Sequence, residues 1–211
     1  MTSLTLTSQQ RESLEQTGAI YIGDTDGFLT DAEWEELEEL CFQSHLPYET
    51  VTVGDANEPN LVEVGRFMTD VEQPRKVNAE VTDRLLQIIA QPARMRMLGE
   101  LLNCKEVYLR RAQVNHMHRG SFVGMHLDTD SNPDYQVSIV LQIGRAFSGG
   151  EFAISLPDGT ETLIEPKFRS TIISRCDYPH EVRTVTQGTR TSIVYFVASH
   201  DGPNRRYLKA S

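Results

Sequence analysis

Two histidines and one aspartate in this chain are residues that commonly bind metal ions. His126 and Asp128 stand two residues apart in GMHLDTDSNPDY (124–135), just before a β-forming run, and His180 follows in YPHEV (178–182). Alternate residues of a strand share a face, so His126 and Asp128 can point in the same direction. Taken alone, the pair fits either a polar turn with a stray histidine or one half of a metal site.

The downstream residues supply a second half. His180 precedes a predicted strand, and Arg190 and Ser192 follow in GTRTSIVYF (188–196). A ligand from a neighbouring strand is expected to be distant in sequence, as His180 is from His126. Two imidazoles and one carboxylate on one face of an octahedral metal leave the opposite face open, as in non-haem Fe(II) oxygenases. The spacing therefore predicts a metal site of this kind.

Four motifs, taken in their order and spacing, resemble the Fe(II)/2-oxoglutarate-dependent dioxygenases, particularly their prolyl-hydroxylase-like branch. They are NHMHRGSFVGMHLD, SGGEF, YPHEV and GTRTSIVYF, and the resemblance covers residues 105–200. It implies a double-stranded β-helix, a jelly roll with the iron at its mouth. It also implies Fe(II), 2-oxoglutarate and O₂ as cofactor and co-substrates, with succinate and CO₂ released.

The resemblance also gives roles to single residues. It makes His126, Asp128 and His180 the iron ligands. Arg190 would bind the distal carboxylate of 2-oxoglutarate, for which a planar guanidinium is suited. Ser192, on the same strand face, would add a hydroxyl group to that carboxylate.

Two places depart from the family pattern. Gln142 lies where relatives often have a tyrosine for the co-substrate, provided that its strand parity faces inward. Residues 116–118 are His-Met-His where many relatives have another co-substrate tyrosine. Whether His116 or His118 contacts the co-substrate is therefore left open.

Further positions bear on the reaction and the substrate class. Related halogenases have a small residue in place of the carboxylate ligand, whereas this chain has Asp128, so hydroxylation of an aliphatic C–H is favoured. Nucleic-acid demethylases of the superfamily carry a second arginine six residues after the co-substrate arginine, and this chain has Phe196 there. The net charge of −10 also disfavours nucleic acid and acidic membranes as partners.

We expect a small-molecule substrate, an amino acid or an amino-acid derivative. The chain has no evident peptide-binding extension, and MHLDTDSNPDY (125–135) is similar to bacterial hydroxylases of free or N-modified amino acids. A carboxylate-bearing substrate would need a cation near the mouth, for which the candidates are Arg119, Arg145 and His118. Two alternatives are a prolyl-type hydroxylase of proteins or peptides, and a non-catalytic metal-binding jelly-roll module.

Composition indicates an ordinary globular protein. The 211 residues, 39% of them hydrophobic, suit one domain (1–211), and no apolar run reaches the roughly 18 residues of a membrane span. The N-terminus lacks the pattern of a secretory signal, and the three cysteines form no CxxC pair. We therefore expect a cytoplasmic protein with reduced thiols, whose oligomeric state the sequence does not define.

The elements predict an α+β fold in which N-terminal helices pack outside a jelly-roll core. Residues 1–104 are mainly helical with a few strands. Ser8 is the predicted cap of a first helix, Thr30 with Glu33 forms a capping box for a second, and Pro92 separates two more. Residues 105–200 contain short β-rich runs between Gly, Pro and Asp turns, which is typical of a jelly-roll catalytic core.

Overall fold

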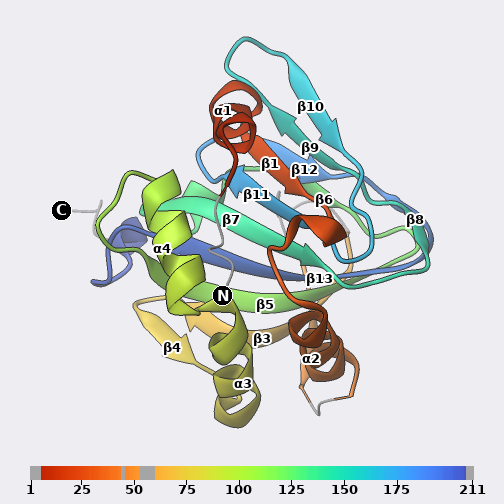
Figure 1. The fold of residues 1–211 in the computed structure, drawn as a ribbon. Helices are drawn as coiled ribbons and strands as arrows, with labels where there is room; N and C mark the ends of the chain where they lie inside the picture. The colour runs from red at the N-terminus through yellow and green to blue at the C-terminus, as the bar shows by residue number, and fades with distance from the viewer. Residues whose placement is uncertain (1–5, 44–45, 53–59, 208–211) are drawn as a thin grey trace.

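The computed structural model describes residues 6–43, 46–52 and 60–207 (Figure 1). Its helices are α1 (Ser8–Thr17), α2 (Asp31–Phe42), α3 (Ala79–Ile89) and α4 (Pro92–Leu101). The strands are β1 (Ala19–Ile22), β2 (Tyr48–Val51), β3 (Val62–Asp70), β4 (Pro74–Lys76), β5 (Tyr108–His118), β6 (Val123–His126), β7 (Tyr135–Gln142), β8 (Phe147–Gly149), β9 (Phe152–Ser155), β10 (Glu161–Ile164), β11 (Thr171–Arg175), β12 (His180–Val182) and β13 (Val185–Ala198).

The strands form two antiparallel sheets. The major sheet has the order β1-β11-β7-β13-β5-β3-β2, with β4 paired to β3 and β8 paired to β13. The minor sheet has the order β10-β9-β12-β6. Apolar side chains from both sheets meet between them, including Val140 with Phe152 and Val64 with Val123. The N-terminal strands β1, β2 and β3 thus extend the same sheet that carries the C-terminal core.

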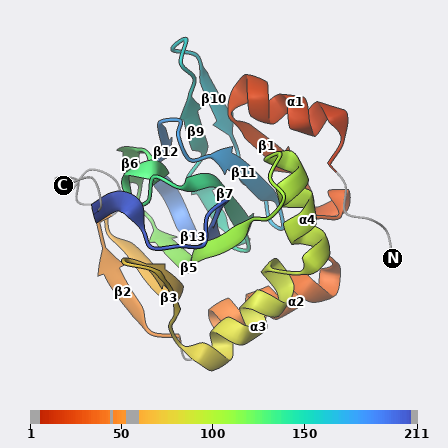
Figure 2. The same cartoon turned by 90° about the vertical axis from the view of Figure 1, so that its left-hand side faces the viewer.

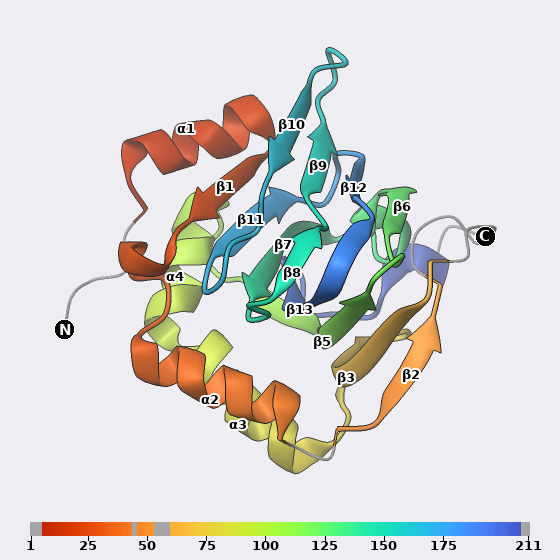
Figure 3. The ribbon, with the colours of Figure 1, turned by 90° about the vertical axis from the view of Figure 1, so that its right-hand side faces the viewer.

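Helices α2, α3 and α4 lie on one side of the major sheet, away from the minor sheet, and α1 lies beside the edge strand β1 (Figures 2 and 3). The largest apolar core fills this layer, where Trp34 and Leu37 of α2 and Leu85 of α3 belong to the same buried cluster as Ile139 and Ile193 of the sheet. Because the outer face of the sheet is covered by helices, its inner face is left to form the site. The predicted α+β jelly-roll class is confirmed.

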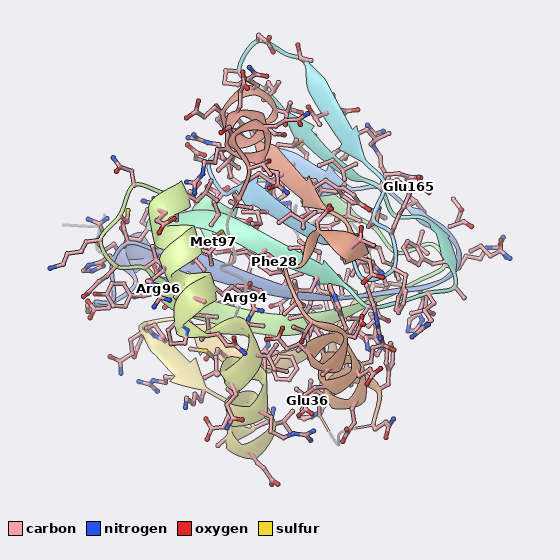
Figure 4. The ribbon with its side chains drawn as sticks, viewed as in Figure 1. Phe28, Glu36, Arg94, Arg96, Met97 and Glu165 are labelled. Atoms are coloured by element: carbon pink, nitrogen blue, oxygen red, sulfur yellow. The ribbon has the colours of Figure 1, made fainter. Side chains whose placement is uncertain are left out.

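Arg94 of α4 connects two helices and a loop in the outer layer (Figure 4). Its guanidinium donates to the carbonyl oxygen of Phe28 at 2.9 Å and lies 3.2 Å from the carboxylate of Glu33. Glu33 also accepts from the backbone N–H of Thr30 at 2.8 Å, which completes the predicted capping box of α2. One carboxylate therefore serves both as a helix cap and as the partner of a buried cation.

Several elements differ from the sequence prediction. The cap of α1 is Thr7, one residue before Ser8, because Thr7 and Gln10 form a reciprocal capping box. The short strand β8 includes the first two residues of SGGEF, and Asp128 lies in the 3₁₀ helix after β6 rather than on a strand with His126. Within the described residues, no helix is both long and apolar enough to cross a membrane.

Candidate metal centre and co-substrate pocket

His126, Asp128 and His180 meet at one point between the two sheets. His126 ends β6 and His180 begins β12, and the two residues are direct partners in the antiparallel pairing of these strands. Asp128 begins the short 3₁₀ helix Asp128–Asp130 that follows β6. One ligand atom from each side chain lies within 4.8 Å of the other two. The structure therefore brings together the three residues that the sequence predicted.

Backbone carbonyls orient both imidazoles toward the aspartate. Nδ1 of His126 lies 2.8 Å from the carbonyl oxygen of Gly124, and Nδ1 of His180 lies 2.9 Å from that of Tyr178. These contacts place the proton on Nδ1 and leave each Nε2 lone pair facing Asp128, at 3.4 Å and 3.3 Å. Metal-binding histidines are typically held in this way by the ring nitrogen that does not bind the metal.

The protonation states also fit a cation. Burial alone would raise the pKa of the Asp128 carboxyl, but the two neighbouring imidazoles, His180 and His126, outweigh it and hold that pKa well below its usual range. Asp128 is therefore a buried carboxylate at neutral pH. Its Oδ2 atom has no hydrogen-bond partner among the described residues. A buried anionic oxygen facing two imidazole nitrogens suits a divalent metal, which accepts all three lone pairs.

A buried polar network holds the loop that carries Asp128. Asp70 of β3 forms a bidentate ion pair with Arg110 of β5, at 3.1 Å and 2.9 Å. The same carboxylate accepts from Nδ2 of Asn132 at 2.7 Å. Nδ2 of Asn204 donates to the carbonyl oxygens of Asp70 and Ser131. The segment after Asp128 is thus attached to the major sheet and to the C-terminal segment.

The three candidate ligands line a cavity of about 420 Å³ between the sheets. Cavities of this size are typical of small-molecule sites. Arg190 and Ser192, on alternate positions of β13, line it as well, as do Ser138 and Val140 of β7. The apolar part of the wall consists of Val51, Val123, Leu127, Val140, Phe152, Val182, Val194 and Phe196.

Arg190 is a buried cation at this cavity, with only 2% of its surface exposed. It forms no ion pair with a described residue, and Nε donates to Oε1 of Gln142 at 3.0 Å. Burial lowers its pKa to about 10, and Glu151 acts in the opposite direction. A buried guanidinium without a carboxylate partner is costly unless a ligand supplies the anion. A buried guanidinium of this kind is what the predicted role of Arg190, binding the distal carboxylate of 2-oxoglutarate, requires.

Gln142 lies beside Arg190, with its amide used by protein groups. Its Nε2 donates to the carbonyl oxygens of Gly144 and Thr191, at 3.2 Å and 3.0 Å, while Oε1 accepts from Arg190. The inward parity expected for residues 138, 140 and 142 is observed. The arrangement indicates that Gln142 holds Arg190, and a direct contact with the co-substrate stays a prediction.

The SGGEF turn also bears on Arg190. At Gly150, which has a φ of +71°, an added Cβ would lie 2.9 Å from Cδ of Arg190. The glycine therefore permits both the turn and the close approach of the arginine.

The remaining sequence candidates lie away from this cavity. His116 is on the opposite face of β5, with its ring 4.5 Å from that of Tyr48. His118 is exposed, between Thr189 and Glu63, and it lines a separate surface pocket with Arg119. Arg145 pairs with Glu38 at 3.0 Å and stacks on the ring of Phe168. None of His116, His118, Arg119 and Arg145 is among the described residues that line the cavity.

Instead, the cavity contains three arginines that the sequence analysis did not single out. They are Arg66 of β3, Arg111 of β5 and Arg206 near the C-terminal end. A signal for Arg111 was present, because Arg111, Gln113 and Asn115 alternate with the buried Ala112 and Val114. Strand parity alone would have placed these polar residues on the inner face.

Comparison with known proteins agrees with this geometry. The model of the 2OG-Fe(II) oxygenase superfamily matches residues 112–198. An oxidoreductase of the 2OG-Fe(II) oxygenase family from Burkholderia pseudomallei is 37% identical, with a TM-score of 0.88 over 94% of this chain and 93% of that chain. A search of curated protein sequences gave no match.

More distant structures share the fold. A prolyl-4-hydroxylase from Pseudomonas putida is 20% identical, with a TM-score of 0.63 over 90% of this chain and 97% of that chain. HygX from Streptomyces hygroscopicus, solved with nickel and 2-oxoglutarate, is 13% identical, with a TM-score of 0.59 over 92% of this chain and 87% of that chain. With the His-Asp-His cluster in place, this chain belongs to the 2OG-Fe(II) oxygenase family and is an oxygenase that uses Fe(II), 2-oxoglutarate and O₂.

Proposed function

We propose that the protein hydroxylates an aliphatic C–H bond of a small molecule, an amino acid or an amino-acid derivative. His126, Asp128 and His180 would hold Fe(II). Arg190, supported by Gln142 and Ser192, would bind the distal carboxylate of 2-oxoglutarate. The observation that carries the proposal is one cavity that contains both the three-ligand cluster and a buried arginine without a carboxylate partner.

The bound metal with 2-oxoglutarate would supply an oxidant from O₂, with succinate and CO₂ as products. The protein has to orient the substrate and exclude water. The valine and phenylalanine side chains of the wall suit the aliphatic part of a substrate, and they give few polar groups for water to bind. The presence of Asp128 favours hydroxylation over halogenation, since it occupies a ligand position that halogenases leave to chloride.

The cavity volume of about 420 Å³ supports a small substrate. The Pseudomonas putida relative is a prolyl-4-hydroxylase, so hydroxylation of a peptide is the second candidate. The two candidates differ in which compounds stimulate turnover.

Succinate formation from 2-oxoglutarate, with Fe(II) and O₂ present, is the measurement that tests the proposal. We expect free or N-modified amino acids to stimulate it and proline-containing peptides to leave it unchanged. Stimulation by peptides alone would favour the second candidate. Absence of O₂-dependent succinate in every sample would contradict the assignment of the site.

A further inference from the structure

Arg111 is a second cavity arginine that forms no ion pair with a described residue. It lies on the inner face of β5, where Nε and Nη2 both donate to one acceptor, Oε1 of Gln113, at 2.9 Å and 2.6 Å. Its Cζ atom lies 5.6 Å from the centroid of the Phe196 ring. A guanidinium has five N–H donors, and these two hydrogen bonds leave Nη1 without a protein acceptor among the described residues. Arg66, by contrast, pairs with Glu49.

The surroundings of Arg111 favour an anion. Burial is the largest effect on its pKa and lowers it, and Tyr135, Asp128 and Asp70 act in the opposite direction. The neighbouring charge of Arg66 lowers the pKa of Arg111 further. Arg206 lines the same cavity. In a protein with a net charge of −10, this group of arginines at a site between low-dielectric walls would attract small anions.

Arg111 and Arg190 mark different levels of the cavity. In the pairing of β13 with β5, Arg190 is opposite Met117, whereas Arg111 is opposite Phe196. Arg190 and Phe196 are six positions apart, which corresponds to about 20 Å along an extended strand. A 2-oxoglutarate molecule that reaches from Arg190 to the metal uses both of its carboxylates there. The guanidinium of Arg111 is then available to another ligand.

We propose that Arg111 anchors a carboxylate of the substrate, in the part of the cavity that Arg66 and Arg206 also line. The planar guanidinium is held by Gln113 and the Phe196 ring, and its remaining donors suit a bidentate carboxylate. The substrate class is therefore a small carboxylic acid, such as an amino acid with a free α-carboxylate. This inference rests on the proposed function, and it replaces Arg119 and Arg145 as candidates for the substrate cation.

The test uses matched pairs of ligands. The twenty amino acids and their N-acetyl derivatives are titrated against their carboxamides by calorimetry, with the full chain loaded anaerobically with Fe(II) and 2-oxoglutarate. In the wild-type protein, we expect at least one acid to bind about tenfold or more tighter than its amide. Arg111→Gln should remove this difference, and Arg111→Lys should retain part of it. Arg75→Gln, the same charge change on β4 outside the cavity, should leave it intact.

A second readout separates this inference from the proposed function. The visible absorption of the anaerobic Fe(II)–2-oxoglutarate complex reports co-substrate binding and an intact fold in each variant. If that absorption never forms in the wild type, the proposed function fails. If it forms but no acid binds better than its amide, only the inference fails.

Two further results would overturn the role of Arg111. One is a weaker affinity of Arg111→Gln for 2-oxoglutarate with acid binding unchanged, which would make the arginine a co-substrate group. The other is loss of acid binding in Arg119→Gln but not in Arg111→Gln.

Discussion

Nε of Arg190 donates to Oε1 of Gln142 across two neighbouring strands, at 3.0 Å. The amide nitrogen of Gln142 is itself held by two backbone carbonyls, so its oxygen is fixed in place. The glutamine therefore determines where the guanidinium lies, without charge of its own.

Gln142→Leu should weaken 2-oxoglutarate binding by roughly tenfold, because it removes a hydrogen bond to a charged group and frees the arginine to move. The apparent KM for 2-oxoglutarate should rise, while the KM for the substrate stays unchanged. Gln142→Asn, with a shorter side chain, should have a KM for 2-oxoglutarate between those of the wild type and Gln142→Leu. An unchanged KM for 2-oxoglutarate in Gln142→Leu would contradict the positioning role.

Arg190→Met should raise the KM for 2-oxoglutarate by roughly a hundredfold, because the anionic co-substrate loses its buried cation. Metal binding should be unaffected, since the arginine does not contact the three candidate ligands. Isothermal titration with Mn(II), followed by 2-oxoglutarate, measures the two steps separately. Loss of the metal step would show that the variant is misfolded rather than defective in the co-substrate site.

Asp128→Ala should abolish hydroxylation, because it removes the anionic ligand and leaves two imidazoles to hold the metal. Fe(II) affinity, measured by anaerobic titration, should fall by at least about a hundredfold. Asp83→Ala, an exposed change outside the site, is the control. Wild-type turnover in Asp128→Ala would remove this residue from the metal centre.

Chelation of the wild-type enzyme should likewise stop succinate formation, and added Fe(II) should restore it.

Gly150→Ala should weaken 2-oxoglutarate binding, because the new Cβ would lie 2.9 Å from Cδ of Arg190. The residue has a φ of +71°, so the substitution also adds backbone strain of about 1–2 kcal/mol. Gly159→Ala is the matched control, with a φ of +85° and no described atom within 4 Å of the added Cβ. Both variants should lose stability in thermal denaturation because of the positive φ, and Gly150→Ala should lose more because of the close contact. Only Gly150→Ala should show a raised KM for 2-oxoglutarate.

Asp70→Asn should lower the free energy of unfolding by about 3–5 kcal/mol, because it leaves the buried charge of Arg110 without its partner. For a chain of this size, the Tm should fall by on the order of 10 °C. Asp31→Asn breaks an exposed ion pair with Arg169 and should change stability by less than about 1 kcal/mol. Equal effects of the two variants would argue against a structural role for the network around Asp70.

The β-rich core was predictable because short β-branched runs between turns identify strands locally. The metal ligands were predictable because the His-x-Asp pair and the distant His180 stand in motifs that resemble the family, although Asp128 lies in a 3₁₀ helix rather than on a strand with His126. The exact cap of α1 was missed because Thr7 and Ser8 are both good N-cap residues, and only the reciprocal bond with Gln10 distinguishes them. Strand β8 was missed because two of its three residues, Ser148 and Gly149, also favour turns.

The cations of the cavity were harder to predict from sequence. Arg119 stands close to His126 in the chain, yet it points to a separate surface pocket, because the turn after β5 carries it beyond the sheet. Arg111 is more distant in sequence but lies on an inward strand position. Proximity along the chain was thus a poorer guide than the alternation of side chains on β5.

Along β5, Nε2 of Gln113 donates to Oδ1 of Asn115 at 2.7 Å, while its Oε1 accepts from Arg111. The orientation of the Gln113 amide is fixed, because its one acceptor atom, Oε1, faces the guanidinium of Arg111. The charged guanidinium of Arg111 is thus bound by the neutral amide dipole of Gln113. Glutamine and glutamate are nearly identical in shape, so a single-atom exchange at position 113 would build a counter-ion into the wall. Gln113→Glu should therefore shift the preference of the cavity from acidic to uncharged substrates.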